Sequence, residues 1–293
     1  MKMYVEKFCI ILVTNKKYIG KSINTLNQIR QIGQYSGDVV LLIGDDLVSD
    51  IDQYTNGLEN VIIKHFPDFD RSDIIEILRQ KPIGSGSGVT KFFQFHKLYC
   101  FHTYFHNWKK CFYIDSGMQI FKPLDKIINL ECNNKLLAHS DAYPYKLGWL
   151  LERQFDNQQF PELYAKLKNE YELFIDYFQS TMMLYDTAII KDNTLEELIK
   201  LSNRYINSIT NDQGILNLYF NSRRKLWEQI RLRDESTNYY DFFERDNLQW
   251  SDYIMLKYPR TFHVKSQDSP TRNLMARCKK ILKKLQEKIS ILH

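Results

Sequence analysis

Two short segments each contain an aspartate that could help to bind and activate a ligand. The first is the apolar run 111–114, which ends at Asp115 and is followed by a Ser-Gly pair. The second is an Asp-Gln pair that begins at Asp212 and opens a segment whose apolar residues recur at helical spacing. A buried strand that ends in aspartate at the rim of an α/β sheet is where such folds bind ligands. We therefore expect Asp115 and Asp212 to belong to a functional site.

Both aspartates also have a structural interpretation. Asp115 could cap a helix or occupy a turn in any α/β protein. Asp212 could be the N-cap of its helix, because aspartate is favoured at that position. Lys97, on the predicted helix before Asp115, could likewise be a solvated surface lysine. The functional interpretation is favoured because further motifs surround these residues.

The elements that would position these residues alternate between strands and helices. Residues 8–13 are an apolar run typical of a buried strand, and residues 38–44 and 61–63 predict two more. Between the first two, apolar residues recur at helical spacing from Ile19 to Ile29, and Gly33 follows where a helix C-cap belongs. Apolar strands that alternate with helices favour a Rossmann-like α/β fold, with a mostly parallel sheet covered on both faces.

The middle of the chain continues this alternation. A long aromatic helix is predicted from Val89 to about Asn107, directly before the strand that ends at Asp115. Residues 136–140 predict a strand that ends at Asp141, and residues 178–185 predict another. Three histidines of the aromatic helix are interpreted as its solvent-facing side and not as a zinc site: His96, His102 and His106.

Composition limits the class of protein. With 293 residues, 44% of them hydrophobic, the chain can bury a sizeable core, and one α/β domain with or without an appendage is expected. Its net charge of +5 is too dilute to indicate nucleic-acid binding. The five cysteines show no Cys-x-x-Cys spacing, so neither disulfides nor zinc is indicated, and a cytoplasmic location is expected. The apolar runs are too short for a signal peptide or a membrane-spanning helix.

The C-terminal segment 273–292 combines an apolar stripe with a row of lysines. This pattern is typical of a basic amphipathic helix, which can lie on an anionic membrane surface or bind a partner. Packing against its own domain or against a second subunit is the favoured interpretation. Residues 266–293 are therefore treated as an appendage, and a homodimer contact and a peripheral membrane contact both stay open.

Four segments resemble motifs of the glycogenin-like (family eight) glycosyltransferases. Residues 97–127 resemble the segment through that family's Asp-x-Asp motif, which here reads Asp115-Ser116-Gly117. Residues 178–184 are similar to its Phe-Asn-Ser-Gly strand, and residues 212–217 are similar to its Asp-Gln motif. Residues 261–264 resemble the late strand that returns a histidine to the metal. The four matches occur in the family's order.

The resemblance implies a GT-A fold in residues 1–265, with a helical insertion at about 148–177 near the acceptor. It implies transfer of a hexose from a nucleotide-sugar, usually a UDP-sugar, to a hydroxyl group of a glycan or protein, with retention of configuration. It also implies a divalent cation, Mn²⁺ or Mg²⁺, which stabilises the negative charge that develops on the departing diphosphate. A histidine ligand favours Mn²⁺. Nucleic acid is not an expected partner.

Carried over residue by residue, the resemblance assigns four roles to positions of this sequence. The metal ligands are Asp115 and His263, and Ser116 and Gly117 complete the donor-binding motif. Lys97 would place a cation near the phosphates or the sugar. The positions that meet the base and ribose, with the tyrosine stacking, are Val13, Thr14, Asn15 and Tyr18. The catalytic positions near the sugar and acceptor are Gln179, Asp212, Gln213 and Asp141.

Two motifs depart from the family pattern. Position 117 is glycine where the family has a second carboxylate, which predicts weaker metal binding. The amide oxygen of Gln119, two residues along the same strand face, could substitute in part. After His263 the usual glycine and Lys-Pro-Trp are missing, and Lys265 could replace the phosphate-binding lysine. Two alternatives stay open: a binding or scaffolding module with a decayed site, and a peripheral membrane or nucleic-acid-binding protein driven by the basic tail.

Overall fold

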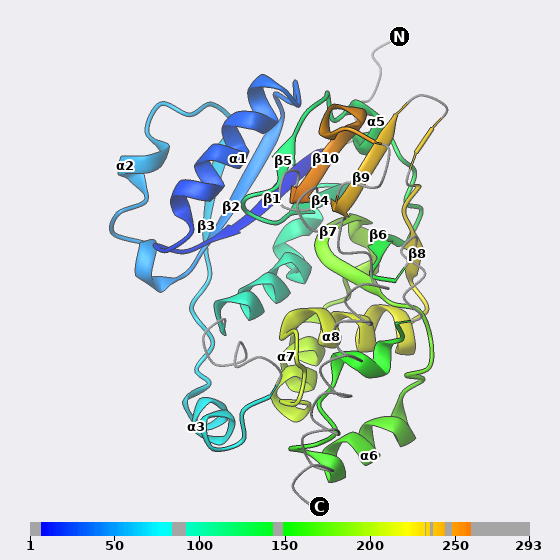
Figure 1. Ribbon diagram of the computed structural model, residues 1–293. Helices are drawn as coiled ribbons and strands as arrows, with labels where there is room; N and C mark the ends of the chain where they lie inside the picture. Colours follow the sequence, from blue (N-terminus) through cyan, green and yellow to red (C-terminus); the bar gives the residue numbers. More distant parts are fainter. Residues whose placement is uncertain are drawn as a thin grey trace, which may run out of the picture.

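A computed structural model describes residues 7–83, 92–142, 149–231, 233–234, 237–243 and 248–258, and its centre is a seven-stranded sheet (Figure 1). The strand order is β3-β2-β1-β4-β7-β6-β8. Neighbouring strands are parallel, except that β7 is antiparallel to both β4 and β6. The strands are β1 (Phe8–Thr14), β2 (Asp38–Ile43), β3 (Val61–His65), β4 (Lys110–Ile114), β6 (Leu136–Ser140), β7 (Phe178–Asp186) and β8 (Trp227–Gln229).

Helices cover both faces of the sheet, as the apolar strands predicted. The α-helices are α1 (Ile19–Gln31), α2 (Asp52–Thr55), α3 (Ser72–Gln80), α5 (Asp125–Ile128), α6 (Pro161–Glu170), α7 (Thr194–Arg204) and α8 (Asp212–Leu216). The 3₁₀-helices used below are η2 (Phe92–Phe101), η3 (Thr103–Asn107) and η4 (Leu151–Gln154), and a π-helix, η6 (Asn217–Arg223), continues α8. In Figure 1, α1 and α2 lie on one side of the sheet, and α6, α7 and α8 lie below it.

The two cores follow from the alternation of side chains along each strand. On β1, Cys9 and Ile11 pack with η2, α7 and α8, whereas Ile10 and Leu12 pack with α1 and α5. All four side chains are fully buried. Burying one aliphatic side chain of this size contributes roughly 1.5–3 kcal/mol. The sheet is therefore held firmly from both sides, and its strand ends form a rigid edge.

A second, three-stranded sheet has the order β5-β10-β9. It consists of β5 (Gln119–Ile120), β10 (Tyr253–Tyr258) and β9 (Asn238–Phe243), and it lies beside α5 in Figure 1. β5 directly follows the Asp115 loop in sequence, and β10 pairs with it in antiparallel register. β10 therefore runs next to that loop. The sequence patterns had not predicted this sheet.

The segment before β4 is helical, but the predicted long α-helix is wrong in the part that the structure describes. Two 3₁₀-helices, η2 and η3, occupy it and are separated by His102, whose backbone is extended. Residues 95–101 are all buried, so no polar face marks a helical period. Tyr99 stacks between Phe66 and Phe69, at 4.4 and 4.6 Å between ring centroids. This packing decides the local geometry.

His96 is not solvent-facing, contrary to the prediction. Its side chain is 1% exposed, and its Nε2 lies 3.1 Å from the carbonyl oxygen of Ile43. Burial lowers the pKa of His96 to about 4, so the ring is neutral near pH 7. His96 therefore joins η2 to the end of β2.

The predicted insertion contains η4 and α6, which lie in the lower part of Figure 1 with α7 and α8. Within the residues that the structure describes, no helix combines the length and apolar character that crossing a membrane requires. The amphipathic segment 266–293 lies outside the described residues. Its predicted packing, dimer contact and membrane contact stay predictions.

Candidate active site

The sheet has a switch point between β1 and β4. From β1 the chain proceeds outward to β2 and β3, whereas β4 lies on the opposite side of β1. In open α/β sheets, ligands bind at the carboxyl ends of the strands beside such a point. Asn15 follows β1 there, and Asp115 follows β4. Because β7 is antiparallel to both neighbours, Gln179 at its start and Asp141 after β6 reach the same edge.

Both carboxylate oxygens of Asp115 have polar partners. Its Oδ1 accepts a hydrogen bond from the Tyr113 hydroxyl at 2.5 Å and lies 3.3 Å from Lys97 Nζ. Its Oδ2 accepts from Lys257 Nζ at 3.2 Å. Burial would raise the pKa of Asp115, but Lys257 and Lys97 outweigh it and hold the pKa at about 2. Asp115 is therefore an ionised carboxylate held between two ammonium groups.

Lys97 is a buried residue of η2 and not a solvated one. Its side chain is 8% exposed, and its Nζ lies 2.9 Å from Asp212 Oδ2. The same ammonium donates to the carbonyl oxygen of Ser180 at 3.1 Å. Burial would lower the pKa of Lys97, but Asp115 and Asp212 outweigh it and the pKa is raised. The Lys97 ammonium group thus joins the carboxyl end of β4 and the amino end of β7 to the start of α8.

Asp212 begins α8 but does not cap it. Its Oδ2 accepts from the Ser180 hydroxyl at 2.7 Å and from Lys97, and no side-chain cap hydrogen bond forms at this helix start. Burial raises the pKa of Asp212, and the ion pair with Lys97 offsets only part of that effect. The N-cap interpretation is therefore wrong. The carboxylate instead belongs to the same charge cluster as Asp115.

The turn after Asp115 is fixed by Ser116 and Gly117. The Ser116 hydroxyl lies 2.7 Å from the Ser22 hydroxyl of α1 and donates to the carbonyl oxygen of Val13 at 3.1 Å. Gly117 has φ of +88°, in the left-handed region that favours glycine. Gln119 was expected to help Asp115, but its Oε1 accepts from Gln28 of α1 at 3.4 Å. The side-chain amide of Gln119 therefore pairs with Gln28 of helix α1 and not with Asp115.

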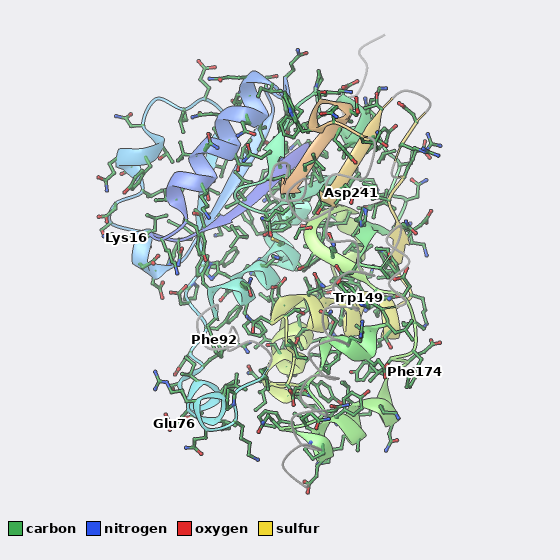
Figure 2. All side chains as sticks on the ribbon, in the orientation of Figure 1. Lys16, Glu76, Phe92, Trp149, Phe174 and Asp241 are labelled. Atoms are coloured by element: carbon green, nitrogen blue, oxygen red, sulfur yellow. The ribbon has the colours of Figure 1, made fainter. Side chains whose placement is uncertain are left out.

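The predicted nucleotide-binding residues line the end of β1 and the turn into α1. Thr14 is fully buried, and Val13 is tied to the Asp115 turn through Ser116. Asn15 Oδ1 is buried with no hydrogen-bond partner among the described residues, so an unused acceptor remains at this position. Tyr18 has the ammonium groups of Lys17 and Lys21 at 5.7 Å from its ring centroid. Figure 2 shows Lys16 at the outer side of this loop.

The predicted sugar and acceptor residues form a continuous polar network. Asp141 accepts from Gln179 Nε2 at 2.8 Å and from the Tyr177 hydroxyl at 2.5 Å. Tyr177 in turn accepts from Gln154 Nε2 at 3.0 Å. Gln213 donates to Gln154 Oε1 at 3.2 Å, and its own Oε1 accepts the backbone N–H of Ser180. The four positions named from the sequence are thus brought to one edge by β6, β7 and α8.

Three residues of this site were missed by sequence reasoning. Lys257, on β10, contacts Asp115 and also lies 3.4 Å from the carbonyl oxygen of Ser116. Tyr240, on β9, is fully buried and donates to Gln179 Oε1 at 3.1 Å. Ser180 lies between Lys97 and Asp212. Ser180 lies within a motif identified from the sequence, but no role was given to it. Lys257 and Tyr240 were missed because the second sheet that carries them had not been predicted.

The residues that the structure describes do not fit a divalent cation. No three His, Cys, Asp or Glu side chains among them converge where they could hold one. Asp115, the expected first ligand, faces Lys97 and Lys257. Like unit charges ~4 Å apart repel by about 4 kcal/mol at an effective dielectric constant of about 20, and a divalent ion would double this. His263, the other predicted metal ligand, and Lys265, the predicted phosphate-binding lysine, lie outside the described residues.

A large cavity lies at the opposite edge of the sheet. It encloses about 960 Å³ and is lined by residues at the amino ends of β1 and β4, among them Phe8, Lys109 and Lys110. None of the site residues at the carboxyl edge lines it. We place the functional site at the carboxyl edge, because the buried charges and the switch point are there.

A comparison of the sequence with models of protein families identifies the family. Residues 9–293 match the profile described as glycosyl transferase family 8. The chain belongs to glycosyl transferase family 8. A comparison with curated proteins finds no match. The protein is therefore a glycosyltransferase by family, and the predicted resemblance is confirmed.

Solved structures show the same GT-A fold as this family 8 chain. A galactosyltransferase LgtC in complex with donor and acceptor sugar analogues matches with a TM-score of 0.53, 11% identity and coverage of 79% of this chain and 75% of LgtC. The apo bifunctional glycosyltransferase WbbM matches at 0.51 and 16%, covering 88% and 46%. Core-mannan synthase A (CmsA/Ktr4) from Aspergillus fumigatus, in a Mn/GDP form, matches at 0.50 and 9%, covering 78% and 74%. Identities this low show the fold alone.

Proposed function

We propose that this family 8 protein transfers a hexose from a UDP-sugar to a hydroxyl group of a glycan or protein, with retention of configuration. The observation that carries the proposal is a set of contacts along this edge. One series of ion pairs runs from Asp115 through Lys97 to Asp212. A series of hydrogen bonds runs from Gln213 through Gln154 and Tyr177 to Asp141. Buried charges gathered at the ligand-binding edge of an α/β sheet are typical of a functional site. The same network gives no support to a decayed binding module.

The donor nucleotide is placed at the end of β1. The unpaired Asn15 Oδ1 is an acceptor, and uracil offers an N–H donor on its base edge. The Tyr18 ring offers a surface for stacking. Guanine also carries N–H donors, and CmsA/Ktr4 binds GDP. The preference for uridine is therefore part of the proposal and is tested below.

The sugar and acceptor are placed at the Asp212 and Asp141 end of the network. Buried Asp212 holds Ser180 and Lys97 in place, and Gln213 braces the β7 backbone at Ser180. Asp141 and Gln179 present polar groups beside the predicted insertion, which would contribute to the acceptor site. Fixed donors and acceptors of this kind orient the reacting groups without reorganisation.

The test is nucleotide binding followed by thermal unfolding. A ligand that binds only the folded state raises the melting temperature. UDP should raise it more than GDP, ADP or CDP at equal concentration, and Asn15→Ala should reduce the UDP effect. A larger increase of the melting temperature with GDP would indicate that the donor is a GDP-sugar and not a UDP-sugar. No increase with any nucleotide would contradict the proposal. The cytoplasmic location stays a prediction.

A further inference from the structure

We propose that Lys257, assisted by Lys21, supplies the positive charge at the donor diphosphate, so that donor binding and cleavage do not require a divalent cation. The inference rests on the proposed function, because it concerns the diphosphate of the same nucleotide-sugar. It begins from the finding that Asp115 is held by the chain's own cations. A carboxylate neutralised in this way is a poor metal ligand and a good anchor for lysines.

The two lysines on Asp115 are not equivalent. Lys97 Nζ is surrounded by Asp115, Asp212, the Ser180 hydroxyl and the Ser180 carbonyl oxygen, all within 3.3 Å. An ammonium group has three hydrogens, so Lys97 is fully used inside the protein. Its role is to position the two aspartates.

Lys257 retains the capacity to bind a ligand. Among the described residues its Nζ donates to Asp115 Oδ2 and Ser116 O, at 3.2 and 3.4 Å. The third ammonium hydrogen is left for a further acceptor. The side chain is 13% exposed, so it reaches the surface at the Asp115 turn. Asp115 thus holds a lysine at the place where the resemblance puts a metal.

Lys21 lies beside the same turn. A Cβ added to Gly117 would lie 3.7 Å from Lys21 Cδ and would meet no other atom within 4 Å. The space where the family's second carboxylate would begin is therefore open and bordered by an exposed lysine of α1. Loss of the carboxylate and the presence of Lys257 act in the same direction, since both make the turn more positive.

The chemistry balances without a metal. The bond between the anomeric carbon and the diphosphate oxygen breaks, and its electron pair stays on that oxygen. The acceptor hydroxyl oxygen bonds to the anomeric carbon, and its proton leaves with the diphosphate. Lys257 remains an ammonium group throughout and donates a charge-assisted hydrogen bond, which strengthens as the oxygen becomes more negative.

Calorimetric titration with UDP, in excess EDTA and separately in Mn²⁺, tests the inference on the full-length protein. Wild type should bind UDP in EDTA, with an affinity within about threefold of that in Mn²⁺. Lys257→Met should weaken binding in EDTA by about 10- to 100-fold, as expected for loss of one charge-assisted hydrogen bond. Lys257→Arg should recover part of this, and Lys21→Met should weaken binding less.

Lys122→Met is the matched control, because Lys122 contacts the backbone of Asp252 beside the same small sheet and lies outside the proposed site. It should bind UDP like wild type. Binding of UDP only when Mn²⁺ is present would overturn the lysine inference and leave the transferase intact. Unchanged affinity in a folded Lys257→Met would also overturn it. Absence of UDP binding in both buffers would instead contradict the proposed function itself.

Discussion

Lys97 Nζ and Asp212 Oδ2 lie 2.9 Å apart, with both side chains less than a tenth exposed. This ion pair joins η2 to α8 across the sheet edge, and Asp115 extends it to β4. A buried charge is tolerated only when it is paired and hydrogen-bonded. Asp115 and Asp212 are therefore joined through a single ammonium group.

Lys97→Met should destabilise the fold. It removes the cation that faces buried Asp212 and leaves that carboxylate uncompensated, which costs about 3–5 kcal/mol, whereas Asp115 keeps its ion pair with Lys257. Urea unfolding should show this as a lower midpoint. Lys16→Met is the control, because Lys16 pairs with Asp50 at the surface and its side chain is 61% exposed. A surface pair contributes less than about 1 kcal/mol. Equal effects in the two variants would show that the Lys97 pair is not structural.

Asp212→Asn should separate turnover from nucleotide binding. The amide keeps the shape of the side chain but removes the charge facing Lys97 and Ser180. We expect sugar transfer to fall about 100-fold or more, with UDP affinity changed by less than about threefold. Parallel turnover and calorimetry would measure both. A matching loss of UDP affinity would assign Asp212 to folding of the site and not to the reaction.

Acid stability should depend on Asp115. Its pKa is held at about 2, below the usual 3.8, so its stabilising contribution is complete above pH 3.8 and is lost as the pH falls through 2. The shift corresponds to about 2 kcal/mol. The stability advantage of wild type over Asp115→Asn should therefore shrink by that amount between pH 5 and acid conditions, as measured by urea unfolding. A constant difference across this range would contradict the assigned ion pairs.

Gly117→Ala should strain the turn after Asp115. The φ of +88° is rarely adopted by a residue with a side chain, and the cost is about 1–2 kcal/mol. Gly20→Ala is the control, because Gly20 lies within helix α1 and an added Cβ would meet nothing within 4 Å. Alanine there should stabilise by about 0.5–1 kcal/mol. Thermal unfolding of the two variants should shift in opposite directions, and a neutral Gly117→Ala would show that the turn is relaxed.

The sheet was predictable because its central strands are buried on both faces. The apolar runs at 8–13, 38–44 and 136–140 match β1, β2 and β6 within a residue or so. Two aspartates named from the sequence, Asp115 and Asp212, both contact Lys97. Their convergence could be anticipated because both lie at the ends of elements that meet at one edge.

The small sheet and the helix type could not be predicted in this way. β10 is recognisable only as a short apolar run interrupted by Lys257, and its pairing with β5 is a long-range contact. Periodicity also fails in η2, where residues 95–101 are buried all round. Gly33 shows a third limit: the left-handed residue at the end of α1 is Gln34, with φ of 54°. An added Cβ on Gly33 would lie 2.7 Å from the carbonyl oxygen of Ile29, so close packing requires the glycine.

The central claim is that the carboxyl edge of this sheet cleaves a nucleotide-sugar. The most direct measurement is release of UDP from a panel of UDP-hexoses by the purified full-length protein, with Asp212→Asn measured in parallel. The account predicts that wild type releases UDP from at least one donor and that the variant releases it about 100-fold more slowly or less. Equal release by both proteins, or no release by wild type from any donor together with no UDP binding, would contradict it.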